Sequence, residues 1–188
     1  INNKGLYLQG NIDNQVIYYG DEVELSDNIK YEGYGFKGWT LTEGSSDIDF
    51  YPKQKISNYT LINNSVFTLY PVYDELIFNV VYSTVEGQYS NGLKVLSKEY
   101  TLDSLTALDI PSFDIQTEYD SKGKIKSKTY YTYNYYTDID DKQYKTVNDI
   151  KKTILDKGLY NYILYLTANN TLKTEKSGSS GGGGSGGS

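Results

Sequence analysis

The sequence predicts a β-rich α+β fold, and three observations support this. Tyrosine occurs 22 times among the 188 residues, together with many threonine, valine and isoleucine residues, which suit a pleated, half-buried strand. The clearest helical periodicity is confined to one segment, Val147–Lys157. A hydrophobic share of 38% supplies enough apolar material for one or two globular domains and excludes a wholly disordered chain.

Strands are predicted wherever β-branched and aromatic residues cluster between turn formers. Nine segments meet this description: Gly5–Leu8, Gln15–Tyr18, Glu22–Leu25, Phe36–Leu41, Phe67–Tyr73, Leu76–Ser83, Leu93–Tyr100, Ile125–Tyr136 and Tyr160–Thr167. A turn is predicted at Asp120-Ser121-Lys122-Gly123, because glycine adopts positive φ without a steric cost. The densest cluster of tyrosines, Tyr130–Tyr136, falls in the predicted strand Ile125–Tyr136.

One helix is predicted at Val147–Lys157, with local signals at both ends. Thr146 stands at the N-cap, and Asp149 lies near the positive end of the helix dipole. Gly158 stands where a left-handed C-cap is needed. A second, shorter helical turn is predicted at Leu102–Leu108. The apolar face of the main helix consists of Val147, Ile150, Ile154 and Leu155.

The residue types that are absent exclude several kinds of chemistry. The chain contains no cysteine and no histidine, so disulfides, thiolate metal sites and a Ser-His-Asp triad are excluded. No enzyme activity and no cofactor are expected. Glu43, Asp47 and Asp49 leave a carboxylate-based glycosidase as a remote alternative. The residues Asp138, Asp140 and Asp141 resemble the start of a Ca²⁺ loop, but they lack its glycine and closing glutamate, so no metal site is expected.

Charge and hydropathy also limit the partners. The formal charge of −6 would repel the phosphates of a nucleic acid, so nucleic-acid binding is not expected. The longest apolar run, Leu76–Tyr82, is interrupted by Asn79, so no membrane insertion is expected either. The tail Ser177–Ser188 reads SGSSGGGGSGGS and looks like an engineered, flexible linker.

Three motifs in residues 5–75 carry a family resemblance. Tyr19–Leu25 reads YGDEVEL, Glu32–Trp39 reads EGYGFKGW, and Leu69–Tyr73 reads LYPVY. This order resembles the Listeria–Bacteroides repeat, which is related to the internalin B-repeats. Pro71 and Tyr73 depart from the alanine and tryptophan of that pattern. The resemblance implies a small β-grasp-like module of a bacterial cell-surface protein, with Trp39 in its core.

A second, divergent copy is predicted in residues 76–176. Tyr136 would correspond to Trp39, and Tyr165 would correspond to Tyr70, with spacings of 165 − 136 = 29 and 70 − 39 = 31 residues. The extra length would form an inserted hairpin around Gln116–Thr129. Chance similarity between β-rich segments is the alternative. The predicted organisation is thus two tandem small β-grasp-like modules, 1–75 and 76–176, followed by the linker 177–188.

The candidate binding residues lie in and after the predicted hairpin. Lysines recur with period two, which would place four like charges on one strand face. In a regular strand three tyrosines would share the opposite face with Ile125, unless a bulge near Tyr130-Tyr131 swaps the faces. These lysines and tyrosines would bind an anionic or aromatic-stacking partner, or serve only as edge protection and strand packing. They are Lys122, Lys124, Lys126, Lys128, Tyr131, Tyr133 and Tyr135.

The leading functional prediction is a non-enzymatic stalk and adhesion element of a bacterial cell surface. The alternative is a dedicated binding domain in which residues 122–136 recognise a host protein or glycan. Both imply an extracellular location, with the targeting signal outside this sequence. The oligomeric state stays open.

Overall fold

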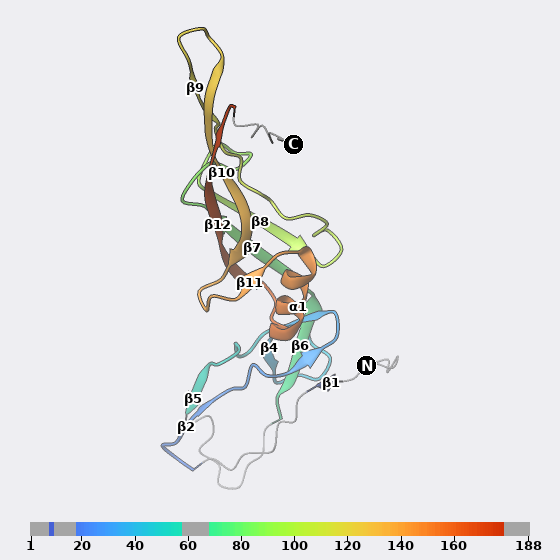
Figure 1. Ribbon diagram of the computed structural model, residues 1–188. Helices are drawn as coiled ribbons and strands as arrows, with labels where there is room; N and C mark the ends of the chain where they lie inside the picture. The colour runs from blue at the N-terminus through green and yellow to red at the C-terminus, as the bar shows by residue number, and fades with distance from the viewer. Residues whose placement is uncertain (1–7, 10–17, 58–67, 179–188) are drawn as a thin grey trace, which may run out of the picture. The chain divides into compact units, whose positions relative to one another are not determined.

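The computed structural model describes residues 8–9, 18–57 and 68–178, and it confirms a β-rich fold (Figure 1). One α-helix, α1 (Val147–Lys157), lies in this part of the chain, and at 11 residues it is too short to cross a membrane. The strands in chain order are β1 (Leu8–Gln9), β2 (Glu22–Glu24), β3 (Lys30–Tyr31), β4 (Tyr34–Thr40), β5 (Lys55–Ser57), β6 (Tyr70–Glu75), β7 (Ile77–Ser83), β8 (Val95–Thr101), β9 (Gln116–Tyr119), β10 (Ile125–Thr137), β11 (Gln143–Tyr144) and β12 (Tyr162–Lys176).

The strand predictions are confirmed for β2, β4, β6, β7, β8 and β10, with ends that differ by a few residues. β12 is confirmed but runs nine residues beyond the predicted end at Thr167. The short strands β3, β5 and β11 were not predicted, because two or three residues carry too little pattern. Most of the predicted segments Gly5–Leu8 and Gln15–Tyr18, and the start of Phe67–Tyr73, lie outside the described residues.

Helix α1 has the predicted bounds because its end signals act locally. The Asp149 carboxylate accepts hydrogen bonds from the Thr146 amide at 2.8 Å and the Thr146 hydroxyl at 3.1 Å. Gly158 adopts the left-handed conformation with φ of 62°, and its amide donates to the Ile154 carbonyl at 2.9 Å. Ile150 and Ile154 of the predicted apolar face are fully buried and Val147 is half-buried, whereas the prediction is wrong for Leu155, which is 42% exposed.

The helical turn predicted at Leu102–Leu108 is confirmed only over its first residues, where the Leu105 amide donates to the Thr101 carbonyl at 3.3 Å. The amides and hydroxyls of Thr101 and Ser104 bond each other reciprocally, at 2.8 and 3.2 Å. Such side-chain bonds to the backbone compete with helix propagation. Leu105, which follows, is fully buried and anchors the turn.

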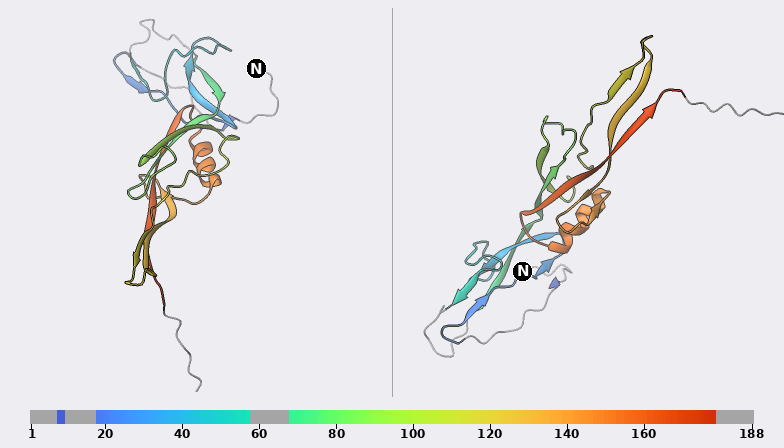
Figure 2. Two further views of the ribbon diagram at one scale, coloured as in Figure 1. Left: turned by 90° about the horizontal axis from the view of Figure 1, so that it is seen from above. Right: turned by 60° about the vertical axis from the view of Figure 1, so that its left-hand side comes forward.

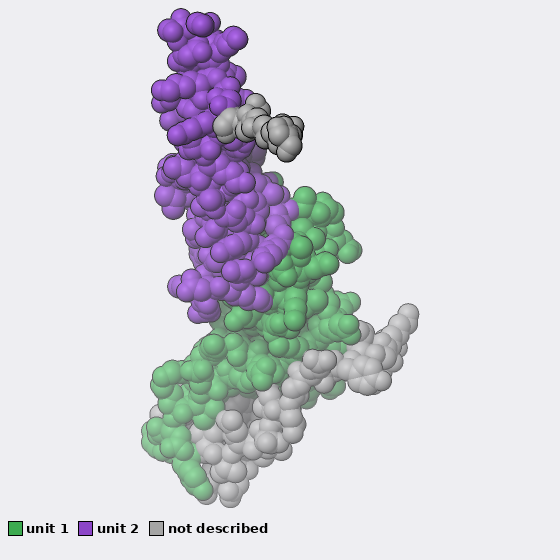
Figure 3. Space-filling model, in the orientation of Figure 1, with its two compact units in different colours: residues 1–80, 98–107, 146–164 green, residues 81–97, 108–145, 165–188 purple. Residues whose placement is uncertain are grey.

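The strands form three sheets. Their orders are β1-β3-β4-β6, β2-β5, and β11-β10-β12-β7-β8 with β9 paired to β10. The chain divides into two compact units, of which unit 1 comprises residues 1–80, 98–107 and 146–164, and unit 2 comprises residues 81–97, 108–145 and 165–188 (Figure 3). The strands β7, β8 and β12 each have residues in both units. The predicted division into repeats 1–75 and 76–176, and their β-grasp architecture, stay a prediction.

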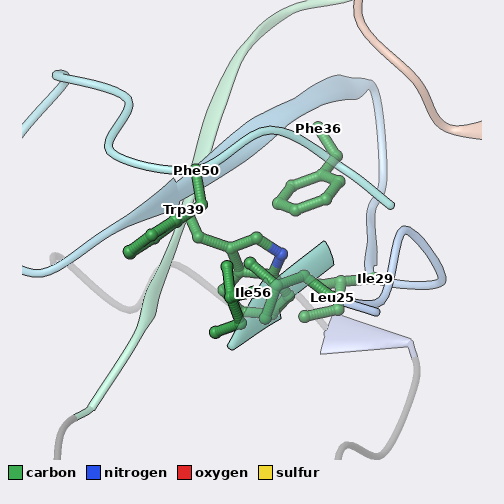
Figure 4. Packing of buried hydrophobic residues seen from close by; sticks show 6 residues of the cluster. All are labelled: Leu25, Ile29, Phe36, Trp39, Phe50 and Ile56. Carbon is green, nitrogen blue, oxygen red and sulfur yellow. The ribbon is translucent and has the colours of Figure 1, made fainter. Parts of the chain in front are cut away.

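Unit 1 contains a buried aromatic and aliphatic cluster (Figure 4). Trp39 is 6% exposed, packs edge-on against Phe36 and donates its indole N–H to the Ser26 carbonyl at 3.1 Å. The predicted core role of Trp39 is confirmed. The cluster consists of Leu25, Ile29, Phe36, Trp39, Phe50 and Ile56.

Unit 1 also contains a close backbone approach at β4. The Phe36 amide donates to the Gly158 carbonyl at 2.9 Å, and the Tyr160 amide donates to the Phe36 carbonyl at 3.2 Å. A Cβ atom on Gly35 would lie 2.6 Å from the Tyr160 Cα, so only glycine fits this position.

Unit 2 has a core that is dominated by tyrosine. The Tyr82 ring lies 5.2 Å from the Tyr136 ring and 6.3 Å from the Tyr89 ring. The hydroxyls of Tyr89 and Tyr136 are 3.0 Å apart, and the Tyr136 hydroxyl donates to the Asp109 carbonyl. Buried phenols need such partners, because a polar group without one destabilises the fold.

Candidate binding surface on the ribbon

The candidate surface lies on a ribbon of unit 2, which we define as β9, β10 and residues 165–176 of β12 (Figure 2). β10 pairs antiparallel with β12 from Ser127 opposite Lys176 to Thr137 opposite Thr167. The other edge of β10 pairs with β9. The hairpin predicted around Gln116–Thr129 is therefore confirmed as a hairpin.

The turn of this hairpin forms as predicted. Gly123 has a φ of 74°, and the Asp120 amide donates to the Lys124 carbonyl at 2.8 Å. The Asp120 carboxylate accepts hydrogen bonds from the amides of Lys122 and Lys124 at 2.8 and 2.9 Å. Lys122 and Lys124 thus belong to the turn and precede the strand.

Only two of the four candidate lysines lie in β10, so the prediction of four lysines on one strand face is wrong. Lys126 stands at a bulge between β9 and β10, and its ammonium lies 3.8 Å from the Glu118 carboxylate. Lys128 stands opposite Glu175 of β12. The hairpin therefore spreads its positive charge over the turn, the bulge and one strand face.

A bulge at Asn134 decides which tyrosines face the core. Tyr133 pairs with Asn170 and Tyr135 pairs with Asn169, so Asn134 is the extra residue. Tyr133 and Tyr136 consequently share a face, with ring centroids 5.1 Å apart, and Tyr135 is on the opposite face. The predicted common face for Tyr131, Tyr133 and Tyr135 is wrong, and the bulge lies beyond the predicted Tyr130-Tyr131.

The inner face of the ribbon packs against the core of unit 2. On β12 it carries the buried Leu166 and Ala168. Tyr131 and Tyr133 are half-buried, and the Tyr131 ring lies 6.4 Å from the Phe113 ring. Burial raises the pKa of Tyr133 to about 12. Of the three candidate tyrosines, these two therefore have a packing role.

The outer face is uncovered along β12. Tyr165 is 62% exposed, and every second residue from it to Glu175 is exposed as well. Asn134 Nδ2 donates to Asn169 Oδ1 at 2.9 Å and to Thr171 Oγ1 at 2.7 Å, which fixes the side chain of the bulge on this face. The outer-face residues of β10 are Lys128, Tyr130, Thr132, Asn134, Tyr135 and Thr137, and those of β12 are Tyr165, Thr167, Asn169, Thr171, Lys173 and Glu175.

The charged side chains of the outer face gather at one end. The Tyr130 hydroxyl donates to Glu175 Oε1 at 2.5 Å, and this hydrogen bond raises the pKa of Tyr130. Lys128 and Lys173 stand opposite Glu175 and Tyr130 in the strand register. At the middle of the face, the Lys145 ammonium lies 5.9 Å from the centroid of the Tyr135 ring.

Two of the carboxylates that were considered for catalysis or metal binding, Asp138 and Asp49, stabilise a turn and a loop. Asp138 accepts hydrogen bonds from the Tyr144 hydroxyl at 2.7 Å and from the amides of Asp140 and Lys142 at 2.9 and 3.0 Å. The Asp49 carboxylate accepts hydrogen bonds from the Leu41 amide and the Thr40 hydroxyl at 2.7 and 3.0 Å. Among the described residues, no group of three or more acidic side chains could hold a metal ion.

Sequence reasoning missed most of the outer face. Asn169 and Thr171 lie beyond the predicted end of this strand at Thr167, and Tyr165, inside the predicted strand, was interpreted as the counterpart of Tyr70. A signal for a longer strand was present, because the alternation of inner-face and exposed residues continues to Asn170. No protein-family model, curated protein or solved structure matches the chain. The function therefore has to be argued from the ribbon itself.

Proposed function

We propose that the chain is a non-enzymatic adhesion module of a bacterial cell-surface protein, which attaches through the ribbon. The length of the ribbon carries this proposal. Leu164, Leu166 and Ala168 of β12 are buried, but all residues from Thr171 to Lys176 are exposed on both faces of the strand. Strand residues that bury neither face add little to the core, so this segment offers its surface to a partner.

Two further observations support a binding role without catalysis. The sequence contains no histidine or cysteine, which are the commonest general base and the strongest nucleophile of enzymes. The carboxylates of Asp49 and Asp138 accept hydrogen bonds that shape a loop and a turn. The resemblance to the Listeria–Bacteroides repeat supports an extracellular location at the cell surface.

A second candidate function is recognition of a host protein or anionic glycan by the hairpin tip. Tyr119 is 62% exposed and Ile125 is 39% exposed, and the two residues stand opposite each other in the register of β9 and β10. Lys122 and Lys124 in the adjacent turn are exposed cations. Such a site would combine apolar contact with electrostatic steering.

A bead assay tests the proposed function. Beads coated with the chain through its C-terminal tail should remain on host cells or matrix under flow, whereas beads with an unrelated protein of equal charge should wash off. Replacing Lys122, Lys124, Lys126 and Lys128 with Gln should reduce only the salt-sensitive part of attachment, if the hairpin tip contributes. Failure to attach would contradict the adhesion role. Turnover of a glycan that Asp47→Asn or Asp49→Asn abolishes would replace it with the glycosidase alternative.

A further inference from the structure

We infer that the outer face of the ribbon binds a neutral polysaccharide. This inference rests on the proposed function, because it assigns a ligand class to the ribbon that the adhesion module would use. The face belongs wholly to unit 2, where β10 and β12 pair over ten positions.

The shape fits an extended ligand. On β12 the outer face runs from Tyr165 to Glu175, which corresponds to roughly 33 Å at the rise of a β-strand. Successive side chains on this face stand about 6.7 Å apart, and the paired strands lie about 4.8 Å apart. The face is therefore a long, narrow strip, which matches a polymer chain better than a compact small molecule.

The side chains that β10 and β12 contribute to the central part of the strip are neutral, and the Lys145 ammonium lies beside them at Tyr135. Between the charged end and Tyr165, every outer-face side chain of β10 and β12 is a hydroxyl, an amide or a phenol: Thr132, Asn134, Tyr135, Thr137, Thr167, Asn169 and Thr171. Within the described residues, Asn134 Oδ1 accepts no hydrogen bond and Asn169 Nδ2 donates none. These two atoms offer a neighbouring acceptor and donor, which sugar hydroxyl groups can satisfy together.

Aromatic rings stand along the same strip. Tyr165 is 62% exposed at one end, and Tyr135 lies four residues further along the register, opposite Asn169. A tyrosine ring presents a flat apolar surface with a polar tip, so it can cover the C–H face of a sugar ring and leave the hydroxyl groups to the amides. The Lys145 ammonium lies 5.9 Å from the centroid of the Tyr135 ring.

The strip is formed before any ligand arrives. The Asn134 side chain is held by two hydrogen bonds to the neighbouring strand, and the hydroxyls of Ser83 and Thr167 lie 3.1 Å apart. Binding would therefore cost little ordering of these side chains. At the charged end, Glu175 stands between Lys128 and Lys173 in the strand register, and its carboxylate already accepts a hydrogen bond from the Tyr130 hydroxyl. This end therefore offers less attraction to an anionic polymer.

Affinity electrophoresis through gels that contain a soluble polysaccharide tests the inference. A neutral β-glucan and a neutral galactomannan are compared with heparin and polygalacturonate. We expect at least one neutral polymer to retard the chain, with an apparent Kd that changes little between about 50 and 500 mM salt. Tyr165→Ala should weaken this binding about tenfold, because it removes one stacked ring.

Two matched variants keep the result interpretable. Tyr51→Ala removes a tyrosine of similar exposure, 66%, from unit 1 and should leave binding unchanged. Asn134→Ala should also weaken binding, and circular dichroism shows whether the ribbon stays folded; Asn169→Ala replaces it if it does not.

Three results would overturn the inference: no retardation by either neutral polymer, retardation that Tyr165→Ala leaves intact, or binding to the anionic polymers alone. If beads still attach to host surfaces in those cases, the adhesion role stands and only the ligand class is wrong.

Discussion

The buried tyrosine network of unit 2 allows an asymmetric prediction. The Asp109 carbonyl carries no proton, so the Tyr136 hydroxyl must donate its single proton to that oxygen. The Tyr89 hydroxyl must then donate to Tyr136 Oη across 3.0 Å. Tyr136→Phe removes both hydrogen bonds and leaves the Tyr89 hydroxyl without its acceptor. Tyr89→Phe removes only one bond and leaves Tyr136 bonded to Asp109.

The magnitudes follow from burial. Tyr89 is 3% exposed and Tyr136 is fully buried, so water cannot replace the lost partners. A net hydrogen bond contributes about 1 kcal/mol, and a buried donor without an acceptor costs about 1–3 kcal/mol. We therefore expect Tyr136→Phe to lower the free energy of unfolding by about 3 kcal/mol and Tyr89→Phe by about 1 kcal/mol. The double variant should be no less stable than Tyr136→Phe, because it no longer contains the Tyr89 hydroxyl that lacks an acceptor.

Urea unfolding followed by circular dichroism measures these differences. In a domain of this size, about 3 kcal/mol corresponds to a fall in Tm of about 6–12 °C. Tyr165→Phe is the matched control, because its exposed hydroxyl can bond water, and it should change stability by less than about 0.5 kcal/mol. If Tyr89→Phe costs as much as Tyr136→Phe, or if the single effects simply add, the assigned direction of the hydrogen bonds is refuted.

Three further predictions test other parts of the fold. Burial raises the pKa of Tyr89 and Tyr133 from 10.0 to about 12, so the folded state keeps protons that the unfolded chain releases. The contribution of these two tyrosines to stability should thus be constant below about pH 9 and be lost from about pH 10 to 12, seen as phenolate absorbance that rises together with loss of circular dichroism. Gly35→Ala should cost about 1–3 kcal/mol in urea unfolding, because its Cβ would meet the Tyr160 backbone; an unchanged midpoint would contradict the close approach. Asp149→Ala should cost about 1 kcal/mol through loss of the N-terminal hydrogen bonds of α1, and an equally stable variant would contradict that role.

Elements with local signals were predictable from the sequence. Helix α1 begins and ends where predicted, because Thr146, Asp149 and Gly158 act on the nearest backbone groups. The turn at Asp120 was predictable because Gly123 marks it. The same hydrogen-bond pattern recurs at Asp138, where an acidic turn was the preferred interpretation; there Asp141 instead of glycine takes the left-handed conformation with φ of 61°.

Features that depend on distant partners were not predictable. The bulge in β10 is stabilised by hydrogen bonds from Asn134 to Asn169 and Thr171, which are 35 and 37 residues away. Nothing in the local alternation of tyrosines marks its position. Likewise, the last residues of β12 are polar on both faces and form a strand only because β10 pairs with them.

The bulge at Asn134 links the core of unit 2 to its outer face. With regular alternation, Tyr133 and Tyr135 would share the inner face, and Tyr136 would turn outward, away from Tyr89. The inserted residue keeps both Tyr133 and Tyr136 inside, and it places its own amide beside Tyr135 on the outside. Stability and the proposed polysaccharide binding are therefore coupled at Asn134. They are separable at Tyr165, whose ring is exposed in a regular part of β12 and whose loss leaves the buried network intact.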